Sequence, residues 1–243
     1  MDGNKIVSEK YMKVMKLGLF VIGILMIFNQ IQINELSSSL GGSTSGSSSV
    51  GFSVASSGSD ISEVDISQVT STAMAVATVF PELQNMKNEE DIMNFMIPTG
   101  TPEYSEALGG ITFDDPVNSM EYLVKLYSSL NEEVKQNDPQ TWQRYLNLAA
   151  APRGISCEFC CGVGPQGISS DGKSKCGCKH NPAVLGLTLS LMQNTDYSDA
   201  EVLREVMKWK TMFFPKNMVG LAMQVAGTDP SQLKDLPGMV GGC

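Results

Sequence analysis

The sequence is short of basic residues and has only one histidine. It contains 17 Lys and Arg against 26 Asp and Glu, which gives a formal net charge of -9, and the one histidine is His180. Unaided binding to a phosphate backbone needs clustered Lys and Arg, so we exclude nucleic acid as a partner. A Ser/His/Asp triad would have to use His180, which lies in a cysteine-rich segment, so serine hydrolysis is not expected. A binding role is favoured over an enzyme.

Lys and Arg are also unevenly distributed near the amino terminus. None lies between Lys16 and Lys87, whereas four lysines precede the uninterrupted apolar run Leu17–Phe28. The positive-inside bias predicts such an asymmetry for an amino terminus kept in the cytoplasm. The run is shorter than the roughly 20 residues that span hydrocarbon, so flanking residues must extend the helix. We expect residues 1–36 to be a cytoplasmic tip and a single-pass anchor in the cell membrane, with the carboxyl part extracytoplasmic.

Three alternatives compete with an uncleaved signal anchor: a cleaved secretory signal, a pilin-like leader and a buried soluble helix. No small-residue cleavage site follows the apolar run, which is against an ordinary signal peptide. Lys16-Leu17-Gly18 could be a pilin-type processing site, but the acidic residue usual a few positions later is missing. No cysteine follows the run to accept a lipid. The uncleaved anchor is therefore the favoured interpretation.

A serine- and glycine-rich segment follows the anchor. Thirteen serines and five glycines lie between Ser37 and Ser62, with few large side chains. Such a composition cannot offset the entropy lost on ordering. We expect residues 37–60 to be a flexible linker and residues 61–243 to form the folded domain.

The domain is predicted to be mainly α-helical, because no convincing strand pair is present and helix-start signals recur. Asp or Asn precedes Pro at four places, where an N-cap side chain would stand before a proline at the first helical position. These places are Asp115-Pro116, Asp138-Pro139, Asn181-Pro182 and Asp229-Pro230. Helices are also expected at Ile61–Phe80 and Asn88–Met96, with a long connection from Ile97 to Asp114.

Apolar residues recur at helical spacing in the same domain. One stripe precedes Asp138, and a second follows the capping box Ser198–Glu201 and ends before Pro215. The stripes are Leu123, Leu126, Tyr127, Leu130 and Val134, then Val202, Val206, Trp209 and Phe213. Asn181–Asn194 is apolar almost all round, which predicts the central buried helix. The 15 methionines are interpreted as core filler rather than copper ligands.

Five of the six cysteines and the histidine fall within 24 residues. They are Cys157, Cys160, Cys161, Cys176, Cys178 and His180. Two short chelating pairs joined by a loop rich in Gly and Ser are typical of a zinc knuckle or ribbon. Once one thiolate of a pair is bound, the second needs little further ordering of the chain. We predict a metal site in loop 154–180, most simply zinc held by Cys157, Cys160, Cys176 and Cys178.

The number of ligands leaves alternatives open. His180 offers a nitrogen, so four cysteines, three cysteines with histidine, or a larger cluster could form the site. Copper and an iron–sulfur cluster are alternatives to zinc, and an electron-transfer or thiol-redox protein is the second functional hypothesis. A third is a structural or pilin-like surface protein whose cysteines form only disulfides. Cys243 could pair with Cys161, link two chains or stay free, and a protein partner at the cell surface or self-association stays open.

Two nucleotide-binding patterns in this window are rejected. Gly167–Ser174 matches the P-loop letters, but Cys-Gly-Cys follows where a helix should begin. Gly162–Gly167 imitates a dinucleotide fingerprint, yet Pro165 does not fit a strand–turn–helix unit. Both are expected to be loop.

The window also carries a family resemblance. Lys175-Cys176-Gly177-Cys178-Lys179-His180, a hydrophobic helix and a second helix opened by Ser-Asp-Ala-Glu follow one another. This segment, from about Cys157 to Pro215, resembles exported bacterial and archaeal proteins with a Pro-Cys-Tyr-Cys-Gly-Cys motif followed by His. The resemblance implies membrane attachment and metal binding. Ser174 stands at the first motif cysteine and the Pro is missing, so only Cys176, Cys178 and His180 carry over directly.

Overall fold

The computed structural model describes residues 60–230, 233 and 236–242. In this part of the chain it contains seven α-helices and no strand, and the only extended pairing is an isolated bridge between Ile168 and Ser174. The prediction of a mainly α-helical domain is therefore confirmed. The expected anchor and nearly all of the expected linker lie outside the described residues. Among the described residues, no helix combines the length and apolar character needed to cross a membrane.

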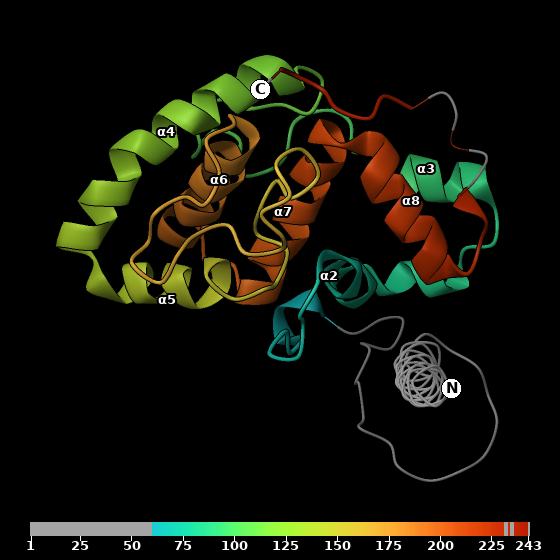
Figure 1. Ribbon diagram of the computed structural model, residues 1–243, viewed down its shortest axis with the longest axis horizontal. Helices are drawn as coiled ribbons and strands as arrows, with labels where there is room; N and C mark the ends of the chain where they lie inside the picture. The colour runs from blue at the N-terminus through green and yellow to red at the C-terminus, as the bar shows by residue number, and fades with distance from the viewer. Residues whose placement is uncertain (1–59, 231–232, 234–235, 243) are drawn as a thin grey trace, which may run out of the picture. The chain divides into compact units, whose positions relative to one another are not determined.

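The other helices lie on the two sides of α7, as Figure 1 shows. On one side α6 packs against α7, and α4 and α5 both pack against α6. On the other side α2 and α8 contact α7, and α3 contacts α8. In chain order the elements are η1 (Ile61–Glu63), α2 (Thr72–Val79), η2 (Pro81–Asn85), α3 (Glu89–Met96), α4 (Pro116–Asn137), α5 (Pro139–Ala149), α6 (His180–Asn194), α7 (Asp199–Phe213) and α8 (Pro215–Ala226).

Three of the predicted helix starts are confirmed by their capping hydrogen bonds. The Asp115 carboxylate accepts from the backbone N–H of Asn118 at the start of α4, and Asp138 does the same for Thr141 in α5. Ser198 forms the full capping box at the start of α7. Each cap satisfies an N–H that the first helical turn leaves without a partner.

The expected single helix over Ile61–Phe80 is wrong. Only a 3₁₀ turn forms at Ile61–Glu63, and α2 begins at Thr72 behind the N-cap Ser71. Between them the Asp65 side chain accepts from both the backbone and the hydroxyl of Ser67. Such local hydrogen bonds give the backbone an alternative to a helix.

Helix α8 was not predicted. Pro215 ends α7, as expected, and is also the first residue of α8, which ends at Gly227 in a left-handed conformation with φ 73°. A proline at the start and a glycine just after the end are ordinary helix boundaries. The signal was present in the sequence but was interpreted only as a stop.

The predicted central helix is confirmed as the buried one. Residues Ala183–Met192 of α6 are all buried, and α6 lies directly against α4. A side chain at Gly186 would overlap the carbonyl oxygen of Leu123 and crowd Tyr127, so the two helices approach closely only because Gly186 has no Cβ. This contact fixes α6 against α4, and the cysteine loop joins α6 at its amino-terminal end.

Candidate metal centre

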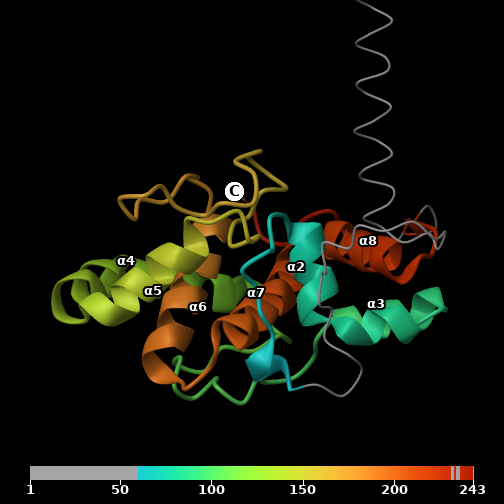
Figure 2. The ribbon, with the colours of Figure 1, turned by 90° about the horizontal axis from the view of Figure 1, so that it is seen from below.

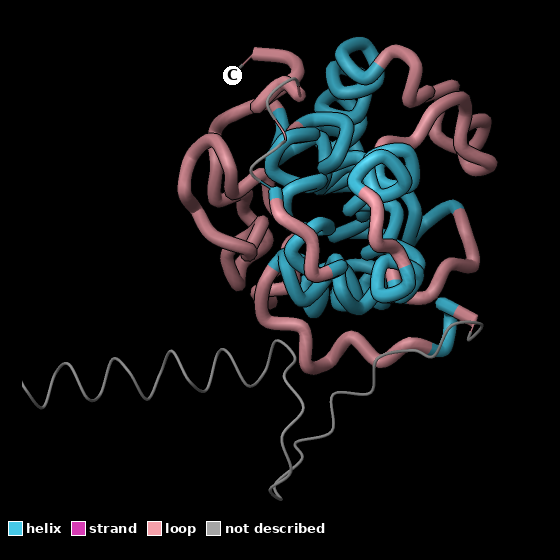
Figure 3. The backbone as a smooth tube through the Cα atoms, turned by 90° about the vertical axis from the view of Figure 1, so that its right-hand side faces the viewer, coloured by secondary structure: helices cyan, strands magenta, loops and turns pink. Residues whose placement is uncertain are grey.

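The cysteine loop connects α5 to α6 and lies outside the helical body. Figures 2 and 3 show this loop and the carboxyl-terminal tail on the same side of the helices. The tail is tied to the body by the backbone N–H of Val240, which donates to Phe213 O, and by that of Lys216, which donates to Pro237 O. These two bonds attach the tail to α7 and α8, on the side of the helices where the loop lies (Figure 2).

Asn181 fixes the folded shape of the loop. Its Oδ1 accepts from the backbone N–H of Cys157 at 3.2 Å, and its Nδ2 donates to Gly167 O at 3.0 Å and to Ser174 Oγ at 2.7 Å. The residue is fully buried. One amide therefore joins three segments of the loop, and it brings the first cysteine pair towards the second.

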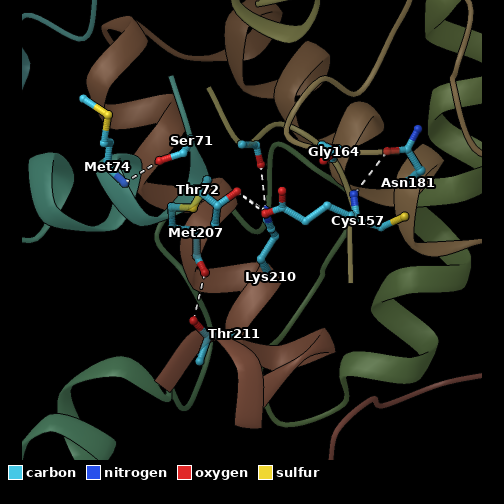
Figure 4. Close-up of polar contacts among 12 residues, drawn as sticks. Ser71, Thr72, Met74, Cys157, Gly164, Asn181, Met207, Lys210 and Thr211 are labelled. Carbon is cyan, nitrogen blue, oxygen red and sulfur yellow. Dashed lines mark hydrogen bonds and ion pairs between the residues drawn. The ribbon is translucent and has the colours of Figure 1, made fainter. Parts of the chain in front are cut away.

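The predicted N-cap role of Asn181 is wrong. Helix α6 begins two residues earlier than that cap implies, at His180, with Lys179 at the N-cap position and no side-chain cap. Asn181 consequently has helical backbone geometry, and its amide points into the loop, as the bond to Cys157 in Figure 4 shows. A buried amide must have partners for both its donor and its acceptor groups, and the loop supplies them.

Five sulfur atoms converge beside the start of α6. Those of Cys157, Cys160, Cys161, Cys176 and Cys178 all lie within 4.8 Å of one another. Cys157 Sγ is 3.6 Å from Cys160, 3.7 Å from Cys176 and 3.2 Å from Cys178. Cys178 Sγ in turn is 3.4 Å from Cys160 and 3.3 Å from Cys176. The loop thus brings all five of the predicted cysteine ligands together.

These spacings are close to those of a tetrahedral thiolate site. Zinc–sulfur bonds of about 2.3 Å give sulfur–sulfur edges of about 3.8 Å. The five separations above, 3.2 to 3.7 Å, fall slightly below that edge. A small outward shift of the side chains would make room for one ion among four sulfurs. The donor set therefore fits a single thiophilic ion.

Cys161 and Cys176 form a disulfide, with their Cα atoms 6.8 Å apart. Cys157, Cys160 and Cys178 remain as thiols. Two sulfurs bonded to each other cannot both occupy corners of one coordination tetrahedron. The cluster therefore contains both a candidate metal site and a disulfide, and the two share Cys176.

Hydrogen bonding within the cluster shifts the acidity of two thiols in opposite directions. The hydrogen bond between Cys157 and Cys178 is the main cause that lowers the pKa of Cys178 well below its ordinary value of 9.0, and hydrogen bonds from His180 and the backbone N–H of Asn181 lower it further. The same hydrogen bond, together with burial, raises the pKa of Cys157. A thiolate at the start of a helix is also favoured by the helix dipole. Within this pair, a negative charge is therefore favoured on Cys178 over Cys157.

His180 lies next to the sulfur cluster rather than among its atoms. The group of mutually close ligand atoms consists of cysteine sulfurs alone. The Nε2 atom of His180 is 2.9 Å from Val240 O, and its ring packs 4.8 Å from that of Phe214. With one nitrogen bonded to the tail and a hydrogen bond to Cys178, the histidine orients a sulfur and ties the tail to the site.

A buried cation lies behind the first cysteine pair. Lys210 of α7 is fully buried, and its Nζ donates to Gly154 O at 2.9 Å, Thr72 Oγ1 at 3.2 Å and Glu158 Oε1 at 3.2 Å. Thr72 Oγ1 also donates to Glu158. Figure 4 shows Lys210 and Thr72 on one side of Cys157 and Asn181 on the other. The cysteine loop is therefore held by polar groups from α2, α6 and α7.

The sequence analysis did not assign a role to Lys210 or Glu158, and it did not predict that the Asn181 side chain would hydrogen-bond to the loop. A signal for Lys210 existed, because it lies four residues after Val206 and three before Phe213, on the apolar stripe of α7. A lysine on such a stripe must find buried partners. Which partners it finds depends on the loop and could not be inferred from α7 alone.

The two rejected nucleotide patterns are loop, as expected. Ser169 and Lys173 form a tight turn, with the Ser169 N–H donating to Lys173 O, and Ile168 bridges Ser174. The segment before Gly167 contains no strand, and α6 begins only at His180.

Comparisons with protein-family models, with curated proteins and with solved structures found no match to this chain. The resemblance to the exported proteins therefore stays a prediction. The candidate site rests on the geometry of the loop alone.

Proposed function

We propose that this protein binds one thiophilic metal ion, most simply zinc, through Cys157, Cys160, Cys176 and Cys178. The observation that carries the proposal is the convergence of these sulfurs at the spacing of a tetrahedral thiolate site. Sulfurs nearly in contact leave space for one ion, which favours a mononuclear centre over a multi-iron cluster. Cys161 and His180 are not among the four ligands of this proposal.

The two sides of the cluster differ in exposure to solvent. Cys157 and Cys176 are buried, whereas Cys160 is exposed and Cys178 is partly exposed. An ion held there is reached from solvent without unfolding of the helical body. This arrangement favours acquisition and transfer of a metal over a role confined to holding the fold together.

The membrane-anchored, extracytoplasmic setting is part of the same proposal and rests on the sequence. The apolar run Leu17–Phe28 with lysines only on its amino-terminal side supports it. We expect the full chain to stay with membranes after a high-salt wash, and the double substitution Ile22→Asp and Ile24→Asp to release it. Retention of the double variant on membranes would contradict the anchor.

The metal proposal is tested by elemental analysis of the full chain, purified under reducing, anaerobic conditions. We expect about one zinc per chain, and loss of zinc in Cys157→Ser and Cys176→Ser, because each removes one of four ligands. Cys176→Ser should also destabilise α6. Cys243→Ser, which changes the one cysteine outside the sequence window Cys157–Cys178, is the matched control and should keep its zinc. An absence of metal from the reduced protein, or unchanged metal content in Cys176→Ser, would overturn the proposal.

A thiol–disulfide role is the second candidate, and one observation favours it. Cys178 Sγ lies 3.3 Å from Cys176 Sγ, which is bonded to Cys161, so a thiolate faces a disulfide. Exchange proceeds by such an attack on a disulfide sulfur. A colourless protein with no bound metal and cyclic oxidation of its thiols would favour this role over metal binding.

A further inference from the structure

The cluster holds one sulfur more than a tetrahedral site needs, and the geometry identifies it as Cys161. Cys176 lies near both Cys157 and Cys178, at 3.7 and 3.3 Å, and is buried. Cys161 lies 3.4 Å from Cys157, is exposed to solvent, and is bonded to Cys176. Of the two bonded sulfurs, Cys176 is thus the better placed ligand and Cys161 the better placed target for a reagent in solution.

Formation of the Cys161–Cys176 bond changes the donor set. The remaining thiols are Cys157, Cys160 and Cys178, which form a triangle with edges of 3.6, 3.2 and 3.4 Å. Zinc in protein sites is almost always tetrahedral and would lack its fourth protein ligand. A three-sulfur set is weaker for zinc and leaves a position open to water.

We propose that Cys161 is a modification site for small-molecule disulfides and that its reaction releases the metal. This proposal rests on the proposed metal-binding function and adds its regulation. The exposed Cys161 attacks the small-molecule disulfide and forms a mixed disulfide with it, and the buried Cys176 then attacks that mixed disulfide. The ion therefore leaves when the surroundings become oxidising and is held when they are reducing.

The chemistry balances with a disulfide of the glutathione class, RSSR, as the oxidant. Cys161, losing its proton, attacks one sulfur of RSSR; the S–S bond breaks, and a mixed disulfide and one RSH result. The Cys176 thiolate then leaves the metal and attacks Cys161 Sγ, which forms the Cys161–Cys176 bond and expels the second RS⁻, protonated by solvent. Two cysteine sulfurs lose two electrons, RSSR gains them, and the divalent ion departs with water in place of its sulfur ligands.

The supporting geometry already exists in the fold. Asn181 of α6 holds the chain on both sides of the pair, through its hydrogen bonds to the Cys157 N–H and to Ser174 Oγ. Cys161 lies in a turn whose Gly162 N–H donates to Glu158 O, so the turn that presents Cys161 is attached to Lys210 through Glu158. The segments that carry Cys161 and the resolving Cys176 are thus both held by contacts to the helical body.

The test uses the full chain carrying Cys243→Ser, loaded with zinc, and oxidised glutathione as the probe. Zinc release is followed with a chromophoric chelator, and the disulfide formed is located by peptide mapping. We expect release to accompany formation of Cys161–Cys176. The Cys161→Ser variant should bind zinc with the same stoichiometry and release it at least about tenfold more slowly.

The outcomes separate this proposal from the one on which it rests. If reduced protein binds no zinc, the metal-binding function itself is overturned. If zinc binds but Cys161→Ser releases it as fast as its parent, or the mapped disulfide is Cys176–Cys178, only the role of Cys161 is overturned. Loss of zinc binding in Cys161→Ser would make Cys161 a ligand and likewise overturn its assignment as the surplus sulfur.

Discussion

Lys210 Nζ lies 3.2 Å from Glu158 Oε1, and Glu158 directly follows Cys157 in the chain. The lysine is fully buried and the Glu158 side chain is 16% exposed. Burial lowers the pKa of Lys210, while the nearby Glu158 carboxylate opposes that shift. Placing a cation in a core is costly unless its donors are satisfied, and here the backbone of Gly154 and the side chains of Thr72 and Glu158 satisfy them. The position of the first cysteine pair therefore depends on a charge in α7.

We expect Lys210→Met to lower the free energy of unfolding by about 3 kcal/mol, because the Glu158 carboxylate and Gly154 O lose a buried partner. Chemical denaturation of the full chain measures this change. Lys125→Met, on an exposed position of α4, is the matched control and should change stability by less than about 0.5 kcal/mol. Adding Glu158→Gln to Lys210→Met should recover part of the loss, and equal losses in the two lysine variants would contradict the role of the ion pair.

Asn181→Asp should weaken zinc binding by about 10- to 100-fold, in the range seen when a group that orients ligands is removed. The aspartate keeps an acceptor for the Cys157 N–H but loses the donors to Gly167 O and Ser174 Oγ, and it brings a negative charge close to the sulfurs. Competition with a chelator of known affinity measures the change. Asn194→Asp, at the exposed far end of α6, should leave the affinity unchanged. A comparable loss in both variants would show that Asn181 has no special place in the loop.

Two glycine-to-alanine substitutions should change the stability of the fold in opposite directions. Gly186→Ala places a methyl group against Leu123 O and should lower stability by about 1–3 kcal/mol through overpacking of α4 on α6. Gly220→Ala, inside α8, meets Leu233 Cδ1 at 3.6 Å, an ordinary contact, and should raise stability by about 0.5–1 kcal/mol through helix propensity. Thermal unfolding of both variants checks the pair. A stabilising Gly186→Ala would mean that α4 and α6 do not approach as closely as described.

The metal-free protein should lose stability as the pH falls below 9. Hydrogen bonds from Cys157 and His180 hold the pKa of Cys178 well below its ordinary value of 9.0 in the folded state. Below pH 9 the unfolded chain therefore binds a proton that the folded chain does not, so the free energy of unfolding rises with pH up to about 9 and falls on acidification. Denaturation at a series of pH values measures the slope. Cys178→Ser should flatten it and Cys243→Ser should not; identical slopes in the three proteins would contradict a Cys178 thiolate.

Helix boundaries were the most predictable part of the fold, because they depend on local chemistry. Asp115, Asp138 and Ser198 cap their helices as predicted, since each bonds to an N–H three residues away. The predicted cap at Asn181 was wrong because the amide of Asn181 hydrogen-bonds instead to Gly167 and Ser174 of the loop. The predicted single helix over Ile61–Phe80 was wrong because the Asp65 side chain accepts a local hydrogen bond from the Ser67 N–H.

The sequence by itself determined that this is a mainly helical domain with a buried α6, and that its sulfur atoms are concentrated in one loop. Both follow from periodicity and from spacing along the chain, which act over a few residues. Only the tertiary structure decided that five cysteines meet at one place, that Cys161 is bonded to Cys176, and that Lys210, from a different helix, holds the loop. Those relationships join residues far apart in sequence, and they are set by which buried donors and acceptors the packed helices bring within reach of each other.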